Sequence, residues 1–281
     1  MDWWIGSWLF NLAPIQLASW LACQMAMLRC EGWVIGNVVW CVVACYSAPR
    51  HTVGSVIPLR NRRDDTAGLR VLGHGVWIPT LTGLGERAHL LSGQITVDTH
   101  ILDVAGLITA EELTGVILVG HSYGGMMVTG AADRMPDRIQ HVVYLDALVP
   151  EDGDTAFALL PPDLASSRRA AAREQGRGLA LPVPGPDAFP IPDGPAKDWF
   201  MRRLCPHPVG SYDSQVHLAR PAGAGLPVTY VAYTSPPLAS IEPSRQRARA
   251  KPGWRYLELA VPHDVEVANP EIVVELLAGI G

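Results

Sequence analysis

The chain has 281 residues, of which 48% are hydrophobic, and it carries a net charge of −5. This length suits one large domain or two small ones with a sizeable core, and an acidic balance without a basic stripe argues against nucleic acid as a partner. The five cysteines lack the paired spacings of a zinc site or a disulfide framework, which favours reduced thiols in a cytoplasmic setting.

Residues 1–66 form an atypical hydrophobic segment. Residues 3–28 contain no charged side chain and are rich in tryptophan, and residues 32–49 are again uncharged. The first stretch is long enough to span a bilayer, but Pro14 interrupts it, and its start lacks the basic residues and cleavage site of a signal peptide. Three interpretations stay open: membrane association through residues 3–48, buried structure peculiar to this chain, or a mistranslated start. The first would replace a cytoplasmic location with a membrane-associated one.

From residue 67 onward, apolar runs typical of strands alternate with segments of helical periodicity. The predicted strands are 76–79, 116–119, 141–145, 228–233 and 254–259, and the predicted helices are 99–113, one ending near 135, 163–175, 245–251 and 270–277. Pro270 fits the first turn of the closing helix. Strands and helices that alternate at this interval imply a parallel sheet with right-handed crossovers. Ligand sites in such sheets lie at the carboxyl ends of the strands.

One short motif carries most of the chemical information. Residues 116–119 are apolar and run directly into Gly120-His121-Ser122-Tyr123-Gly124, and a segment of small residues follows. A serine at a sharp strand-to-helix turn projects its hydroxyl above the sheet, and glycines beside it avoid the collisions that side chains would cause. Amides at the start of the next helix stabilise negative charge at the same place. The motif predicts a nucleophile elbow at Ser122; the alternative is a glycine-rich turn that happens to contain serine.

Residues 151–220 interrupt the alternation of strands and helices. The segment is dominated by proline, glycine and alanine, and it contains an apolar cluster that includes Trp199, Phe200 and Leu204. An insertion between core strands on the active-site side is typical of a cap. We expect the cluster either to line a substrate pocket or to anchor the cap to the core.

Several further motifs occur in one order along the chain. They are PTLTGLGERAHL at 79–90, DTH at 98–100, GHSYGG at 120–125, YLDA at 144–147, VPEDG at 149–153 and HD at 263–264. With them the chain resembles the α/β-hydrolase fold superfamily, and within it the bacterial esterase-like branch related to plant methyl-ester esterases and hydroxynitrile lyases. The resemblance implies a mostly parallel central sheet flanked by helices in residues 67–281, with a small cap at about 151–220. It implies no metal and no organic cofactor.

The resemblance makes Ser122 the nucleophile and His263 its general base. A serine hydroxyl at its ordinary pKa is a weak nucleophile, so a neighbouring imidazole must take its proton. The position of His263 supports this role independently, because it follows the last predicted strand in a loop that can reach back over the sheet. The alternative for His263 is an exposed loop histidine without a catalytic role.

The triad acid has two candidates. Many members of the superfamily place it after the strand that corresponds to 228–233, but residues 234–237 hold no carboxylate, and Glu242 is the first one available. Asp146 ends the strand that follows the nucleophile helix, a position that some α/β-hydrolases use. The order Ser122, Asp146, His263 is then kept, so Asp146 is the favoured candidate and Glu242 the alternative.

The oxyanion hole departs from the resemblance. One donor is expected to be the backbone amide of Tyr123, and the second normally comes from a His-Gly loop after an early strand. The corresponding window at 47–54 holds no such loop. Either residues 38–45 replace the missing strand, or the first 65 or so residues are not the usual N-terminus, as a frame slip in the coding DNA would produce.

Together these motifs predict a serine hydrolase that cleaves a small carboxylic ester or lactone through an acyl-enzyme. Two other hypotheses stay open. A hydroxynitrile-lyase-like enzyme would use the same three residues, and a catalytically impaired binding protein would explain the incomplete oxyanion hole. The sequence leaves the substrate and the oligomeric state undetermined.

Overall fold

The structure is a computed structural model that describes residues 40–47, 50–51 and 68–280. The chain divides into two units, residues 1–33 and 34–281, and the first lies entirely outside the described residues. Most of the segment proposed for membrane association, 3–48, therefore lies outside them too. In the described part of the chain, no helix combines the length and the apolar character needed to cross a membrane.

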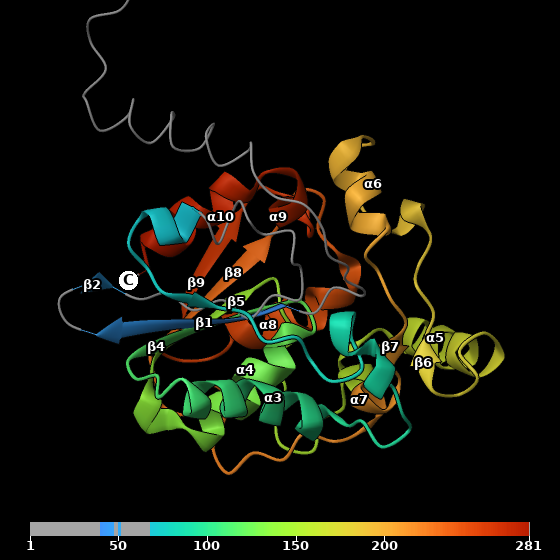
Figure 1. Ribbon diagram of the computed structural model, residues 1–281, viewed down its shortest axis with the longest axis horizontal. Coiled ribbons are helices and arrows are strands. Elements are labelled where there is room, and N and C mark those ends of the chain that lie inside the picture. Colours follow the sequence, from blue (N-terminus) through green and yellow to red (C-terminus); the bar gives the residue numbers. More distant parts are fainter. Residues whose placement is uncertain (1–39, 48–49, 52–67, 281) are drawn as a thin grey trace, which may run out of the picture. The chain divides into compact units, whose positions relative to one another are not determined.

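Within the described residues, seven strands form the central sheet (Figure 1). The strands are β1 (Trp40–Ser47), β2 (Arg50–His51), β3 (Val76–Trp77), β4 (Val116–His121), β5 (Ile139–Leu145), β8 (Val228–Tyr233) and β9 (Arg255–Leu259). Their order is β2-β1-β4-β5-β8-β9, and β3 pairs with β1. The pairs β4–β5, β5–β8 and β8–β9 are parallel, whereas β1 is antiparallel to each of its partners. The predicted parallel core of the sheet is confirmed.

Helices cover both faces of this sheet, as Figure 1 shows. On β4, Val116 and Leu118 pack into the same core as α3 (Val97–Ala110), α4 (Gly124–Arg134) and α8 (Glu242–Arg249). The alternate residues Ile117 and Val119 pack against the opposite side, which includes α9 (Val265–Ala268) and α10 (Pro270–Ala278). Because successive side chains of a strand point to opposite faces, a strand buried on both sides must be apolar throughout. This explains the unbroken apolar run before the serine motif.

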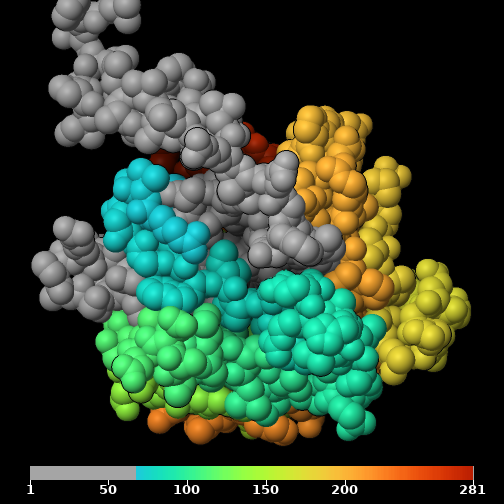
Figure 2. Space-filling model, viewed as in Figure 1, coloured from blue at the N-terminus to red at the C-terminus, as the bar shows by residue number. Residues whose placement is uncertain are grey.

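The cap lies between β5 and β8. It consists of the α-helices α5 (Pro162–Glu174), α6 (Pro195–Met201) and α7 (Gly210–Asp213), the short 3-10 helices Ala156–Leu159 and Pro186–Ala188, and a small antiparallel sheet of β6 (Ala180–Leu181) and β7 (His207–Pro208). In Figure 2 these residues, yellow to orange, form the surface beside the green segment that contains α3.

The motif at 79–90 forms a loop after β3 that continues into a short 3-10 helix (Gly85–Leu90), and it is fixed to α3. The Asp103 carboxylate accepts hydrogen bonds from the Thr82 backbone N–H (2.6 Å) and from the Arg87 guanidinium (2.7 Å). His100, fully buried on α3, contacts the Thr82 carbonyl at 2.9 Å. Burial outweighs this contact and lowers the pKa of His100 to about 4, so the imidazole is neutral at pH 7. The motif therefore has a structural role in placing the loop.

Candidate active site

Ser122 occupies the sharp turn between β4 and α4. Its φ is +53°, in the left-handed region that non-glycine residues rarely adopt. The neighbouring glycines make the turn possible. A Cβ on Gly120 would lie 2.7 Å from the Gly124 carbonyl oxygen, and a Cβ on Gly125 would lie 1.8 Å from the Leu148 oxygen. The structure thus has the strained strand-to-helix geometry of a nucleophile elbow.

Asp146 follows directly on β5, the strand next to β4 in the sheet, and its side chain is fully buried. One carboxylate oxygen, Oδ2, lies 2.7 Å from Nδ1 of His263. Because an ionised carboxylate only accepts hydrogen bonds, His263 donates through Nδ1, and its second nitrogen, Nε2, is left to act as a base. The carboxyl ends of two parallel strands thus supply both the serine and this carboxylate.

His263 lies in the loop between β9 and α9, with 6% of its surface exposed. A second histidine, His121, binds the backbone of this loop. Nε2 of His121, at the end of β4, donates to the His263 backbone carbonyl at 2.8 Å, and the two ring centroids are 4.4 Å apart. His121 belongs to the serine motif and directly precedes the nucleophile. Here it links the serine-bearing strand to the loop of His263.

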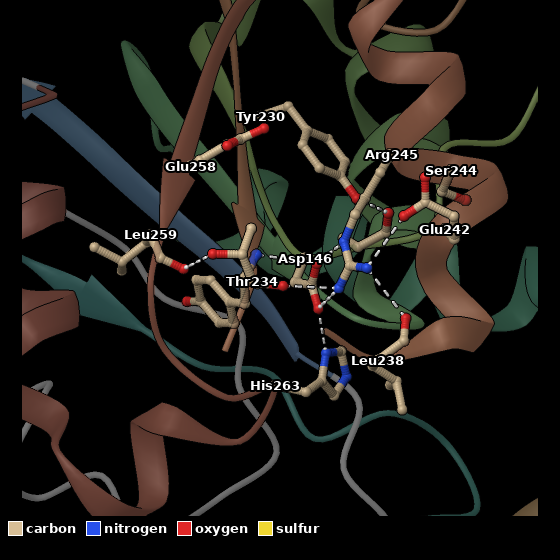
Figure 3. A network of polar contacts seen from close by, with 12 residues as sticks. Asp146, Tyr230, Thr234, Leu238, Glu242, Ser244, Arg245, Glu258, Leu259 and His263 are labelled. Carbon is tan, nitrogen blue, oxygen red and sulfur yellow. Dashed lines mark hydrogen bonds and ion pairs between the residues drawn. The ribbon is translucent and has the colours of Figure 1, made fainter. Parts of the chain in front are cut away.

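A buried arginine holds the carboxylate from the other side (Figure 3). Arg245, on α8, donates from Nε to Asp146 Oδ1 at 2.8 Å and from Nη2 to Oδ2 at 2.9 Å. The Tyr233 backbone N–H also donates to Oδ1, at 3.2 Å. Asp146 therefore accepts three hydrogen bonds besides the one from His263. Sequence reasoning missed Arg245, because nothing in the sequence distinguishes it from the other basic residues of this helix.

The pKa values of these groups are shifted by burial and by one another. Burial lowers the pKa of His263, but the hydrogen bond and charge of Asp146, with the charges of Asp264 and Glu266, outweigh it and raise the pKa above its ordinary value. Burial raises the pKa of Asp146, yet hydrogen bonds and charge from His263 and Arg245 bring it below its ordinary value. Asp146 is therefore an anion at neutral pH.

Glu242, the alternative acid, lies at the start of α8. It contacts Arg245 Nη1 at 3.4 Å and Gln246 at 3.1 Å, with 45% of its side chain exposed. None of its hydrogen bonds or ion pairs involves His263. Of the two candidate carboxylates, the structure brings Asp146 to the imidazole and leaves Glu242 beside the arginine.

A cavity of about 710 Å³ opens between the core and the cap, and both Ser122 and His263 line it. Most of its wall is apolar, and the cap contributes Phe189, Tyr212 and Arg168. This volume is in the range of sites that hold drug-sized ligands. Sequence reasoning did not place these cap residues in the pocket, because the proline- and glycine-rich course of the cap gives no signal for which side chains face inward.

The apolar cluster predicted for the pocket lies elsewhere. Trp199, Phe200 and Leu204 are not among the residues that line this cavity. Phe200 is fully buried, and its ring meets Phe189 edge-on at 4.9 Å, while Trp199 and Leu204 pack against the core side that holds α9. Such packing corresponds to the second expectation for these residues, which is that they anchor the cap to the core.

Of the two expected oxyanion donors, the structure describes the first, the Tyr123 backbone amide, but not the second. Tyr123 directly precedes α4, and among the described residues its backbone N–H has no hydrogen-bond acceptor. The strand expected near 38–45 is present as β1 next to β4, but it runs in the opposite direction, with Trp40 opposite His121. The residues that follow it fold back in a hairpin with β2 at the other end of β4. β1 therefore ends on the side of the sheet away from Ser122, and residues 1–39, 48–49 and 52–67 lie outside the described part.

No group of three or more His, Cys, Asp or Glu side chains in the described part of the chain is arranged to hold a metal ion. The polar groups around Ser122 include its own hydroxyl, the His263 imidazole with the Asp146 carboxylate behind it, and the backbone amides at the start of α4. This set is suited to moving a proton and stabilising an oxyanion during attack on a carbonyl.

Comparison with known proteins agrees with this chemistry. The model of the alpha/beta hydrolase family matches residues 39–276. A carbendazim hydrolyzing esterase of Nocardioides sp. (strain SG-4G) is 42% identical over 230 residues, which cover 78% of this chain and 93% of that protein. The putative chloroplastic methylesterase 12 of Arabidopsis thaliana is 33% identical over 89 residues, or 30% of this chain and 25% of that protein.

Among solved structures, an extracellular alpha/beta-hydrolase from a Paenibacillus species superposes with a TM-score of 0.68 at 23% identity, covering 77% of this chain and 91% of that one. This likeness shows the fold. The chain therefore belongs to the alpha/beta hydrolase family. Within the family it is an esterase-like enzyme, of the carboxylic ester hydrolase class. The predicted fold and the predicted branch are both confirmed.

Proposed function

We propose that this enzyme hydrolyses carboxylic esters through a Ser122–His263–Asp146 triad and an acyl-enzyme. The observation that carries the proposal is the 2.7 Å hydrogen bond between His263 Nδ1 and Asp146 Oδ2, made beside a cavity that Ser122 and His263 both line. The strained φ of Ser122 supports it further, because residues at such angles cluster at functional sites.

In the first half-reaction, the Ser122 oxygen attacks the ester carbonyl while its proton passes to Nε2 of His263. The Tyr123 amide faces the oxyanion that forms. The C–O bond to the alcohol then breaks, and the alcohol leaves with the proton from His263. In the second half-reaction, water attacks the acyl-enzyme with His263 again as base, and the carboxylic acid is released. Asp146 stays ionised throughout and stabilises the imidazolium.

The cavity indicates the kind of substrate. Its apolar wall, with Phe189 and Tyr212 among its residues, suits an apolar or aromatic ester of moderate size. The relative named for carbendazim hydrolysis is 42% identical, and carbendazim is a methyl carbamate on an aromatic heterocycle. Carbamates of this kind are therefore the second substrate class that we propose, attacked at the carbamate carbonyl by the same serine.

Hydrolysis and covalent labelling test the proposal together. The purified enzyme is expected to hydrolyse p-nitrophenyl acetate and to react with a fluorophosphonate probe, with the label located on the peptide that contains Ser122 by mass spectrometry. Assays with carbendazim in parallel separate the carbamate class from simple esters. Absence of both labelling and turnover, in protein that gives the circular dichroism of a folded α/β domain, would rule the proposal out.

The activity should depend on pH through His263. Its pKa is raised by Asp146, and the base must be neutral, so kcat/KM should fall as the pH drops through an acid limb above the ordinary value of about 6.5. The rate of p-nitrophenyl acetate hydrolysis between pH 5 and 9 measures this limb. Replacing the exposed His217 with Gln is the control and should leave the limb in place. A rate that stays constant down to pH 5 would contradict the role of His263.

A further inference from the structure

Arg245 is a buried cation whose contacts are concentrated on the triad acid. It is 3% exposed, although it lies on a helix whose other arginines reach the surface. Besides the two bonds to Asp146, its guanidinium donates to the Tyr233 carbonyl at 2.9 Å, the Leu238 carbonyl at 3.2 Å and the Glu242 carboxylate at 3.4 Å. These contacts use all five N–H donors of the side chain.

The buried Arg245–Asp146 ion pair is not explained by a gain in the stability of the fold. Removing two charges from water costs several kcal/mol, and the attraction between them offsets that cost only in part, so buried pairs contribute little net stability. The pair differs from an ordinary one because its anion is shared. Asp146 Oδ2 accepts from Arg245 and from His263 at the same time, so any change at Arg245 acts on the imidazole as well.

We propose that Arg245 is a positioning residue of the triad, which fixes the Asp146 carboxylate toward His263 and offsets part of the negative charge that stabilises the imidazolium. The inference rests on the proposed function, since it assigns a role to Arg245 through the same three residues. In this role, Arg245 would keep the Asp146 carboxylate, at the end of β5, oriented toward His263.

The orientation follows from the hydrogen bonds seen in Figure 3. Oδ1 accepts from Arg245 Nε and from the Tyr233 backbone, and Oδ2 accepts from Arg245 Nη2. The planar fork of the guanidinium fits the carboxylate in one plane only. Rotation of the carboxylate would break at least one of these bonds, so the lone pair of Oδ2 stays directed at His263 Nδ1.

The charge effect follows from the groups that face His263. The anions Asp146, Asp264 and Glu266 all stabilise the imidazolium, and the neighbouring His121 ring donates a hydrogen bond to the His263 carbonyl. Arg245 faces Asp146, the Glu242 carboxylate and the Tyr230 hydroxyl. It is therefore a cation in direct contact with the carboxylate that His263 binds. Loss of its charge should therefore raise the pKa of His263 further. Because Arg245 contacts the Asp146 carboxylate and not the imidazole itself, we expect a rise of about one unit.

The test compares two replacements of Arg245 with one matched control on the same helix. Arg245→Gln removes the charge and keeps a donor, Arg245→Lys keeps the charge and loses the fork, and Arg247→Gln is the control. Arg247 lies on the same helix and pairs with Asp154 at 2.5 Å, with 28% of its side chain exposed. In each protein the His263 imidazole is titrated by NMR after 15N-histidine labelling, its signal being assigned by comparison with His263→Asn. The pH profile of p-nitrophenyl acetate hydrolysis is measured alongside.

Arg245→Gln is expected to raise the His263 midpoint and the acid limb of kcat/KM by about one pH unit. Arg245→Lys should keep the midpoint near that of the unchanged enzyme but lower kcat by at least ~10-fold, because the carboxylate loses its fixed orientation. Arg247→Gln should alter neither. An unchanged or lowered midpoint in folded Arg245→Gln would overturn the proposal. If that variant does not fold, full kcat in Arg245→Lys would overturn it.

The NMR titration keeps this inference separate from the proposed function. It reads the imidazole directly and needs no turnover. If the unchanged enzyme hydrolyses no ester and takes no fluorophosphonate label, the proposed function fails. If the unchanged enzyme hydrolyses esters and takes the label, but Arg245→Gln leaves the His263 midpoint unchanged, the role proposed for Arg245 is wrong and the proposed triad is unaffected.

Discussion

Ser122→Ala should abolish ester hydrolysis while leaving the protein folded. Without the nucleophile no acyl-enzyme can form, and loss of kcat is expected on the order of 10⁵-fold or more, to the level that the remaining groups support. The alanine is expected to fit the turn, because the substitution removes only the hydroxyl and the backbone already adopts the strained φ of +53° with a Cβ present. Initial rates with p-nitrophenyl acetate and labelling by a fluorophosphonate measure both consequences.

A matched serine provides the control for this prediction. Ser166 is exposed on α5 of the cap and is not among the residues that line the cavity. Ser166→Ala should therefore keep both activity and labelling. Substantial residual activity in Ser122→Ala, with label still taken up elsewhere in the chain, would show that another residue is the nucleophile.

Asp146→Asn should lower kcat by about 10⁴-fold, the loss expected when a triad histidine is held in the wrong tautomer. Two donors point at the Oδ1 position, the Arg245 Nε–H and the Tyr233 backbone N–H. The asparagine oxygen is expected to take that position, which leaves its NH₂ group facing His263. Nδ1 must then accept instead of donate, the proton moves to Nε2, and the imidazole can no longer take a proton from serine.

Glu242→Gln is the control that separates the two candidate acids. Glu242 is half-exposed and has no bond to His263, so its replacement should change kcat by less than about tenfold. Steady-state kinetics of both variants at pH 8 measure the difference. Asp146→Asn also leaves Arg245 as a buried cation with fewer acceptors, and a fall of about 3 kcal/mol in the free energy of unfolding is expected. Equal losses of activity in both variants would contradict the assignment of Asp146.

Much of the fold could be predicted because its signals are local. The run of apolar residues before Ser122 and the glycines around it fix a strand, a turn and a helix within one short window, and the structure has β4 and α4 there. The last strands and the closing helix were predicted within a few residues of their ends for the same reason. His263 could be singled out because it directly follows the last of these strands.

The rest depends on contacts between distant parts of the chain. Arg245 and Asp146 are 99 residues apart in sequence, and nothing in a basic helix indicates that one arginine points inward. The apolar cluster around Phe200 has the same composition whether it faces a substrate or the core. The direction of β1 was equally inaccessible, because apolar periodicity predicts that a strand forms but not which way it runs in the sheet.

The placement of the carboxylate on β5 has a consequence for how this scaffold can vary. The loop after β8, where many members of the superfamily carry the acid, here borders the cavity with Leu238, Ala239, Ser240 and Ile241, and its Leu238 carbonyl accepts a hydrogen bond from Arg245. Because this stretch carries none of the three proposed triad residues, its side chains can change and reshape the cavity while Ser122, His263 and Asp146 keep their places. Divergence in the compounds accepted, whether natural or by directed evolution, is most easily achieved there.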